Sequence, residues 1–298
     1  MATLIAASLL TGCTPPGDYG TNGTDRTRAP GASLPDGITV AVQQSRSDVA
    51  QRRLKVSVTN DGLDPLTVTG LRFSAPQFTE AAVWPKASTT VRPGTTVDLP
   101  VALAAPDCSA DGPPTVTLRF RAEETAKDGD PREHEATVTP DDLFDRLPAL
   151  RAEDCLADAV AAVAIITAPG PVRTTDAGGS PAVTLDLVVA PTGNAGSFRI
   201  DTVTGTTLLA PADTTTGDRR DAVAIDATVS ADAGRTTVPL TFVPNRCDAH
   251  AIAEDKRGTI LPLHVTGPDG VAGIVPVPPD ETTRSALYAF VAEACGLS

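Results

Sequence analysis

The chain has 298 residues, long enough for about two domains of average size. Hydrophobic residues make up 41% and charged residues 20%, a composition that excludes a chain disordered throughout. The net charge of −13 argues against nucleic acid and anionic lipid as partners. Aromatic residues, at 3%, are too few for an extended surface that stacks sugars or bases.

The N-terminal residues form a short apolar stretch that ends in Leu10-Thr11-Gly12-Cys13. A small residue before such a cysteine resembles the lipobox of bacterial lipoproteins, which implies cleavage before Cys13 and lipid attachment to its thiol. Residues 1–12 contain no Lys or Arg, so this signal segment departs from the usual positive start. Few lysines and many Ala, Thr, Asp, Val and Pro residues make the chain similar to an actinobacterial lipoprotein. We expect a lipid anchor on the outer face of the cytoplasmic membrane.

Residues 13–35 follow the lipobox and are rich in Thr, Gly and Pro, with no apolar period. This composition predicts a flexible tether. The remaining chain is expected to form two domains, over residues 36–156 and 157–298.

The other four cysteines mark an internal repeat. Cys108 and Cys155 have nearly the same spacing as Cys247 and Cys295, and both second members end an Ala-Glu-x-Cys sequence. One structural unit used twice explains this match. Of the three possible pairings, the repeat selects Cys108–Cys155 and Cys247–Cys295, which requires an oxidising compartment.

Within each unit, hydrophobic residues alternate with a period of two, in short segments separated by turn sequences such as Asn60-Asp61-Gly62. This pattern is typical of antiparallel β-sandwiches. The alternating segments are Ile38–Val42, Leu54–Val58, Leu66–Val68, Val97–Leu103, Val116–Phe120, Val183–Leu187, Phe198–Ile200, Val223–Val229, Val238–Phe242 and Leu261–Val265.

The order of strands and turns from Val56 to Leu103 resembles bacterial immunoglobulin-like modules, in which an N-x-G turn joins two core strands. The resemblance implies two tandem immunoglobulin-like sandwiches of mainly β structure, each with one disulfide. It implies no particular activity.

A short helix is expected at the end of each unit. The first begins at Thr139-Pro140 and is interrupted at Pro148, whereas the second runs without a break over 280–294. The apolar segment Ala159–Thr167 is expected to be the first strand of the second unit.

The sequence contains no P-loop, dinucleotide fingerprint, H-E-x-x-H or G-x-S-x-G motif. One segment, Cys247–Arg257, is longer than its counterpart in the first unit. A short helix here would place His250 and Glu254 on one face, with Asp248 nearby, as ligands for a metal. We favour the interpretation that this segment is a solvated capping turn without catalytic function. Recognition of a partner is the second choice, ahead of a metal site.

Two other features have two interpretations each. Trp84 is either a core residue, which we favour, or an exposed contact for a partner. The acidic segment Glu123–Glu135 either binds calcium or, as we favour, forms a charged hairpin tip.

The sequence therefore predicts a non-enzymatic binding module of the cell envelope with no cofactor, whose partner is an envelope protein or a cell-wall component. Two alternatives stay open. One is an accessory or sensor subunit of a transport or secretion complex, and the other is a metal-assisted hydrolase that uses the His250 segment.

Overall fold

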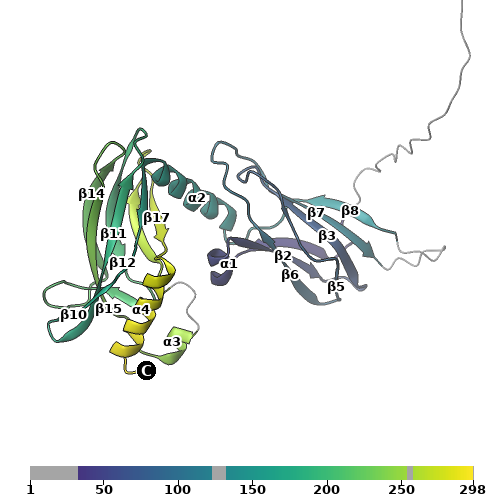
Figure 1. Ribbon diagram of the computed structural model, residues 1–298. Helices are drawn as coiled ribbons and strands as arrows, with labels where there is room; N and C mark the ends of the chain where they lie inside the picture. The colour runs from purple at the N-terminus through teal and green to yellow at the C-terminus, as the bar shows by residue number, and fades with distance from the viewer. Residues whose placement is uncertain (1–32, 123–131, 254–257, 298) are drawn as a thin grey trace, which may run out of the picture. The chain divides into compact units, whose positions relative to one another are not determined.

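A computed structural model of the protein describes residues 33–122, 132–253 and 258–297. These residues form two antiparallel β-sandwiches in tandem, each followed by a helix (Figure 1). Cys13, the signal segment and all of the expected tether except Ser33–Pro35 lie outside the described residues. None of the described helices is long and apolar enough to cross a membrane.

The first sandwich pairs β1-β2-β6 in one sheet and β4-β3-β7-β8 in the other, where β5 also pairs with β3. A short helix, α1, joins β1 to β2. The elements are β1 (Ile38–Gln43), α1 (Arg46–Ala50), β2 (Arg53–Asn60), β3 (Leu66–Ser74), β4 (Ala82–Val83), β5 (Thr89–Val91), β6 (Thr95–Ala102), β7 (Thr115–Ala122) and β8 (His134–Val138).

The second sandwich pairs β10-β11-β15-β13 in one sheet, where β9 also pairs with β11, and β14-β12-β16-β17 in the other. The elements are α2 (Arg146–Val163), β9 (Ala164–Thr167), β10 (Arg173–Ala177), β11 (Ser180–Pro191), β12 (Ser197–Thr204), β13 (Leu209–Pro211), β14 (Ala222–Ser230), β15 (Thr236–Pro244), α3 (Ala249–Ala253), β16 (Leu261–Thr266), β17 (Ala272–Val277) and α4 (Glu281–Ala294).

The two sandwiches repeat one topology. The order β1-β2-β6 matches β9-β11-β15, and the order β3-β7-β8 matches β12-β16-β17. Register shifts occur at matching places, between Val68 and Gly70 in β3 and between Ile200 and Thr202 in β12. Parallel bridges also match, because Ala41 of β1 pairs with Asp141 before α2, and Ala168, directly after β9, pairs with Pro279 before α4. The sequence repeat is therefore a repeat of structure.

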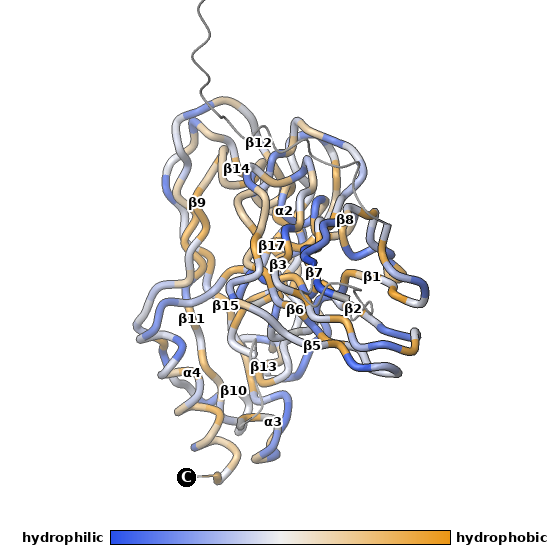
Figure 2. Tube along the Cα trace, turned by 90° about the vertical axis from the view of Figure 1, so that its right-hand side faces the viewer, coloured by the Kyte–Doolittle hydropathy of each residue, from blue (hydrophilic) through white to orange (hydrophobic). Residues whose placement is uncertain are grey.

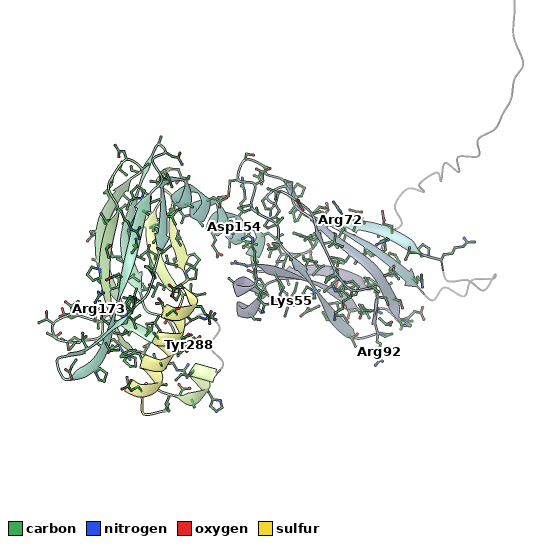
Figure 3. All side chains as sticks on the ribbon, in the orientation of Figure 1. Lys55, Arg72, Arg92, Asp154, Arg173 and Tyr288 are labelled. Atoms are coloured by element: carbon green, nitrogen blue, oxygen red, sulfur yellow. A yellow bond between two sulfur atoms is a disulfide. The ribbon has the colours of Figure 1, made fainter. Side chains whose placement is uncertain are left out.

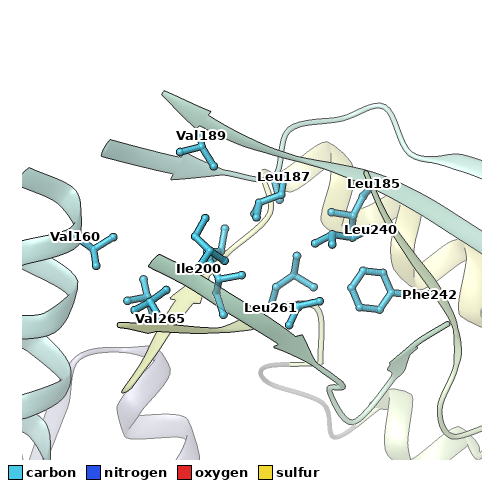
Figure 4. Packing of buried hydrophobic residues seen from close by; sticks show 14 of the residues in the cluster. Val160, Leu185, Leu187, Val189, Ile200, Leu240, Phe242, Leu261 and Val265 are labelled. Carbon is cyan, nitrogen blue, oxygen red and sulfur yellow. The ribbon is translucent and has the colours of Figure 1, made fainter. Parts of the chain in front are cut away.

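Each sandwich has its own hydrophobic core, built by the alternation that the sequence shows (Figure 2). Every alternating segment predicted above lies in a strand, except that Leu103 follows the end of β6. In the second core, Leu185 and Leu187 of β11 and Phe242 of β15 point toward Ile200 and Leu261 of the opposite sheet (Figure 4). All five side chains are fully buried.

Helix α2 joins the two sandwiches and contributes to both cores. Leu147 and Leu150 pack in the first core, and Leu156, Val160 and Val163 pack in the second. Figure 4 shows Val160 directed from α2 toward the second core. The expected domain boundary after residue 156 thus lies inside a continuous helix.

Two expectations about this region were wrong. Helix α2 begins at Arg146 instead of Thr139, and Pro148 does not interrupt it. Pro148 is the third helical residue, where a backbone N–H has no partner within the helix, so proline is tolerated. In the segment Ala159–Thr167, only Ala164–Thr167 form a strand, because the helix continues through Val163.

Helix α4 agrees with its prediction. Asp280 is the N-cap, and its carboxylate accepts a hydrogen bond from the Thr283 backbone N–H at 2.7 Å. Leu287, Phe290 and Val291 form its buried face.

Both predicted disulfides are present. Cys108–Cys155 links the segment after β6 to α2, and Cys247–Cys295 links the segment after β15 to the end of α4. Their Cα atoms lie 5.6 and 5.1 Å apart, and the sequence separations are 47 and 48 residues. Each disulfide joins a sandwich to the helix that follows it.

Candidate interaction surface

The structure does not assemble the metal site considered around His250. Helix α3 forms in this segment as expected, but His250 is exposed to solvent. The Asp248 carboxylate pairs with the Arg246 guanidinium at 2.8 Å. Glu254 lies outside the described residues. No group of three metal-ligating side chains occurs among the described residues.

Trp84 is a core residue, as favoured above, so it offers no exposed ring to a partner. It is 4% exposed and belongs to the first hydrophobic core. Its backbone N–H donates to the carbonyl of Leu71 at 3.0 Å.

Most of the acidic segment Glu123–Glu135, with Asp128 and Asp130, lies outside the described residues. Of its described members, Glu133 accepts a hydrogen bond from the Thr69 hydroxyl at 2.6 Å. His134 stacks against Phe120, with ring centroids 5.6 Å apart.

The structure reveals a different feature in the turn Asp141–Asp145, which precedes α2. Asp141 is held by β1, because its N–H donates to the Val40 carbonyl at 2.9 Å and its carbonyl accepts from the Val42 N–H at 2.8 Å. The Asp142 carboxylate accepts the first backbone N–H groups of α2, from Arg146 at 2.8 Å and Leu147 at 2.7 Å. The turn is therefore fixed at both ends.

Between these fixed points, two large apolar side chains face solvent. Leu143 is 79% exposed and Phe144 is 81% exposed. Single exposed apolar residues are common on protein surfaces, but an adjacent Leu and Phe on a fixed turn are a more specific feature. Leu143, Phe144 and their acidic neighbours are named the Leu-Phe turn below, with the bounds Asp141–Asp145.

The second sandwich provides an internal comparison for this turn. There the helix starts directly after the capping Asp280, and the next two residues, Glu281 and Thr282, are exposed and polar. The Glu281 carboxylate pairs with Arg284 at 2.6 Å. The repeated fold therefore closes without apolar residues at this position, so folding does not require the exposure of Leu143 and Phe144.

The electrostatic character of the Leu-Phe turn is acidic. Asp141 and Asp145 are exposed, and neither forms an ion pair within the described residues. The adjacent Arg146 is already paired, since its guanidinium binds the Glu153 carboxylate at 2.8 and 3.0 Å and the Gln44 side-chain oxygen at 2.7 Å. The hydrogen bonds to Glu153 raise the pKa of Arg146, despite partial burial.

A second ion pair holds α2 against the first sandwich. The Arg52 guanidinium binds both oxygens of Asp154 at 2.7 and 2.9 Å and also donates to the Ala104 carbonyl at 2.9 Å. Figure 3 marks Asp154 on α2. Arg52 has a positive φ of 49°, a conformation that costs backbone energy in a residue with a Cβ. Together with the disulfide to Cys155, this contact fixes the helix on which the Leu-Phe turn depends.

Sequence reasoning missed the Leu-Phe turn because it placed Leu143 and Phe144 inside a helix that began at Thr139. Their exposure depends on where α2 begins. The sequence gives no local signal against that placement, because Leu143, Leu147 and Leu150 have the i, i+4, i+7 spacing of one helical face.

Comparison with known proteins identifies no family. No family model matches the chain, and a search of curated proteins likewise finds no match. Similar solved structures include the calcium-binding domain CBD12 of CALX1.1, which is 10% identical over 78% of each chain with a TM-score of 0.20. They also include red sea bream transglutaminase, 12% identical over 83% of this chain and 32% of that chain, with a TM-score of 0.20. A BSP domain of a biofilm-associated protein is 9% identical over 87% of this chain and 60% of that chain, with a TM-score of 0.18. Scores this low carry no argument about function.

Proposed function

We propose that this protein is an extracytoplasmic, membrane-anchored interaction module that binds a protein of the cell envelope through the Leu-Phe turn. One observation carries the proposal: Leu143 and Phe144 are about four-fifths exposed on a turn that is fixed at both ends.

The energetics of this turn suit protein binding. Moving a Leu or Phe side chain from water into an apolar pocket is worth about 1.5–3 kcal/mol. The hydrogen bonds of Asp141 and Asp142 already order the backbone, so binding loses little further conformational entropy. Two adjacent buried anchors of this kind are enough for a binding hot spot.

The cellular location rests on the cysteines. Two disulfides form readily outside the cytoplasm and are rare inside it. The lipobox around Cys13 supports attachment to a membrane by acyl chains.

The proposal favours a protein partner over a cell-wall component because a Leu-Phe pair matches an apolar pocket, whereas wall glycans present mainly polar groups. It includes the case in which the protein is an accessory subunit of an envelope complex. No described contact supports the metal-assisted hydrolase considered for the His250 segment.

The test uses the full chain in its native membrane, with mild crosslinking and affinity purification. The double variant Leu143→Ala/Phe144→Ala is expected to lose a defined membrane partner at least tenfold, while the unfolding midpoint stays unchanged. The matched control is Glu281→Ala/Thr282→Ala, at the equivalent position of the second sandwich, which should keep the partner. Equal recovery with both double variants, or sedimentation with purified cell wall, would contradict the proposal.

A further inference from the structure

The acidic residues of the Leu-Phe turn specify the chemistry of its partner. We infer that the partner surface is an apolar pocket with Lys or Arg side chains at its rim. This inference rests on the proposed function, because it requires that Leu143 and Phe144 are buried on binding.

Asp141 and Asp145 lie at the two ends of the turn, two residues from Leu143 and one residue from Phe144, respectively, and both side chains are exposed. A pocket that covers Leu143 and Phe144 therefore brings its rim close to both carboxylates.

Burial of the turn against a partner would remove water from the carboxylates of Asp141 and Asp145. A carboxylate that loses water without gaining a cation or hydrogen-bond donors is strongly unfavourable. Neither Asp141 nor Asp145 has a cationic partner within the described residues, and Arg146 is occupied by Glu153 and Gln44. The chain itself does not compensate these charges, so the compensating cations must come from the partner.

The second sandwich has a different charge arrangement at the equivalent position. There the residues after the capping Asp280 are polar, and the Glu281 carboxylate is neutralised by Arg284 of the same helix. The first sandwich thus differs in two respects at once: it exposes an apolar pair, and it leaves the surrounding carboxylates without an internal cation. Both differences fit a partner that combines an apolar pocket with Lys or Arg side chains at its rim.

A membrane is a poorer match than a protein. Anionic headgroups would repel Asp141 and Asp145, and the net charge of −13 adds to this repulsion. A second copy of the chain would carry the same negative charge.

The experiment places the photo-crosslinker p-benzoylphenylalanine at position 144 of the full, anchored chain. The control carries it at position 282, the equivalent place in the second sandwich. Ultraviolet irradiation of intact membranes is performed at 50 and 500 mM NaCl, and the adduct is identified by mass spectrometry. The same measurements are made on Asp141→Asn/Asp145→Asn, which keeps side-chain size and suits the left-handed backbone of Asp145.

We expect an adduct from position 144 only, at a partner peptide that contains or adjoins Lys or Arg. The Asn double variant should lower the yield about three- to tenfold at 50 mM NaCl, the effect of two exposed ion pairs, and should remove most of the salt dependence.

A single adduct that is insensitive to salt and to the Asn variant overturns the basic rim but leaves the proposed function standing. The absence of any adduct overturns both. An adduct with the mass of two copies would show that the turn binds a second copy of the chain, which contradicts the proposed partner. Binding of the purified chain to vesicles of phosphatidylglycerol that requires Phe144 would show that the turn binds a membrane, which contradicts it as well.

Discussion

Substituting Gly273 by alanine should destabilise the packing of α2 on the second sandwich. A Cβ atom at Gly273 of β17 would lie 2.6 Å from Cδ2 of Leu156, far inside van der Waals contact. Leu156 is 6% exposed and belongs to the second core, so it has little space to move away. Overpacking of this kind typically costs about 1–3 kcal/mol of unfolding free energy.

The assay is urea denaturation followed by circular dichroism, with a double-mutant cycle. Leu156→Ala alone should cost about 2–5 kcal/mol by creating a cavity. In Leu156→Ala/Gly273→Ala, the new methyl group occupies part of that cavity, so the double variant should be more stable than the sum predicts by at least about 1 kcal/mol. Gly234→Ala is the matched control, because a Cβ there meets nothing within 4 Å, and its effect should stay within about 0.5 kcal/mol. Additive effects of the two substitutions would refute the contact between Leu156 and Gly273.

Three further predictions concern single features of the fold. Asp142→Ala should lower the unfolding free energy by about 1–2 kcal/mol because α2 loses its capping carboxylate. It should also weaken crosslinking from the Leu-Phe turn. An unchanged crosslinking yield would show that the cap does not contribute to binding. Asp48 is buried, which raises its pKa, but hydrogen bonds from Ser45 and the nearby cations outweigh burial and lower it overall. The contribution of the Asp48 carboxylate to the free energy of unfolding is present at neutral pH and is lost as pH falls below about 4. The difference in unfolding free energy between the protein and Asp48→Asn should therefore shrink in acid. A constant difference from pH 7 to pH 2 would contradict this. Replacing Cys247 and Cys295 by serine should cost about 2–4 kcal/mol in denaturation experiments, and a loss below about 1 kcal/mol would show that packing alone holds α4 in place.

The strands were predictable from the sequence because alternation is a local signal. Leu54, Leu99 and Leu118 each occupy the buried position that the period of two assigns to them. The disulfides were predictable for another reason: the repeat gives each cysteine an equivalent one, which reduces the three pairings to one.

The region around α2 was less predictable because its structure depends on contacts between distant residues. The segment Ala159–Val163 consists of Ala and Val, which suit a buried strand or a buried helix equally well in a short window. The helix is selected by Leu156, Val160 and Val163, which share a face and meet the second core. The capping role of Asp142 was hidden as well, because it acts on N–H groups four and five residues further along the chain.

The candidate site followed the same rule. His250 and Trp84 were singled out because of their residue type, yet one is a solvated surface residue and the other fills a core. Leu143 and Phe144 are of residue types that usually fill a core, and only the fold shows that they are exposed.

Because α2 meets the first sandwich through Leu150 as well as through Asp154 and Cys155, the spacing of these residues is constrained by rotation as well as by distance. Adding one residue to an α-helix turns everything beyond it by about 100° and advances it by about 1.5 Å. An insertion between Leu150 and Asp154 would therefore turn Asp154 and Cys155 away from Arg52 and Cys108, their partners in the first sandwich. Related chains that vary in length are thus expected to vary in their surface turns and to keep this helical segment constant.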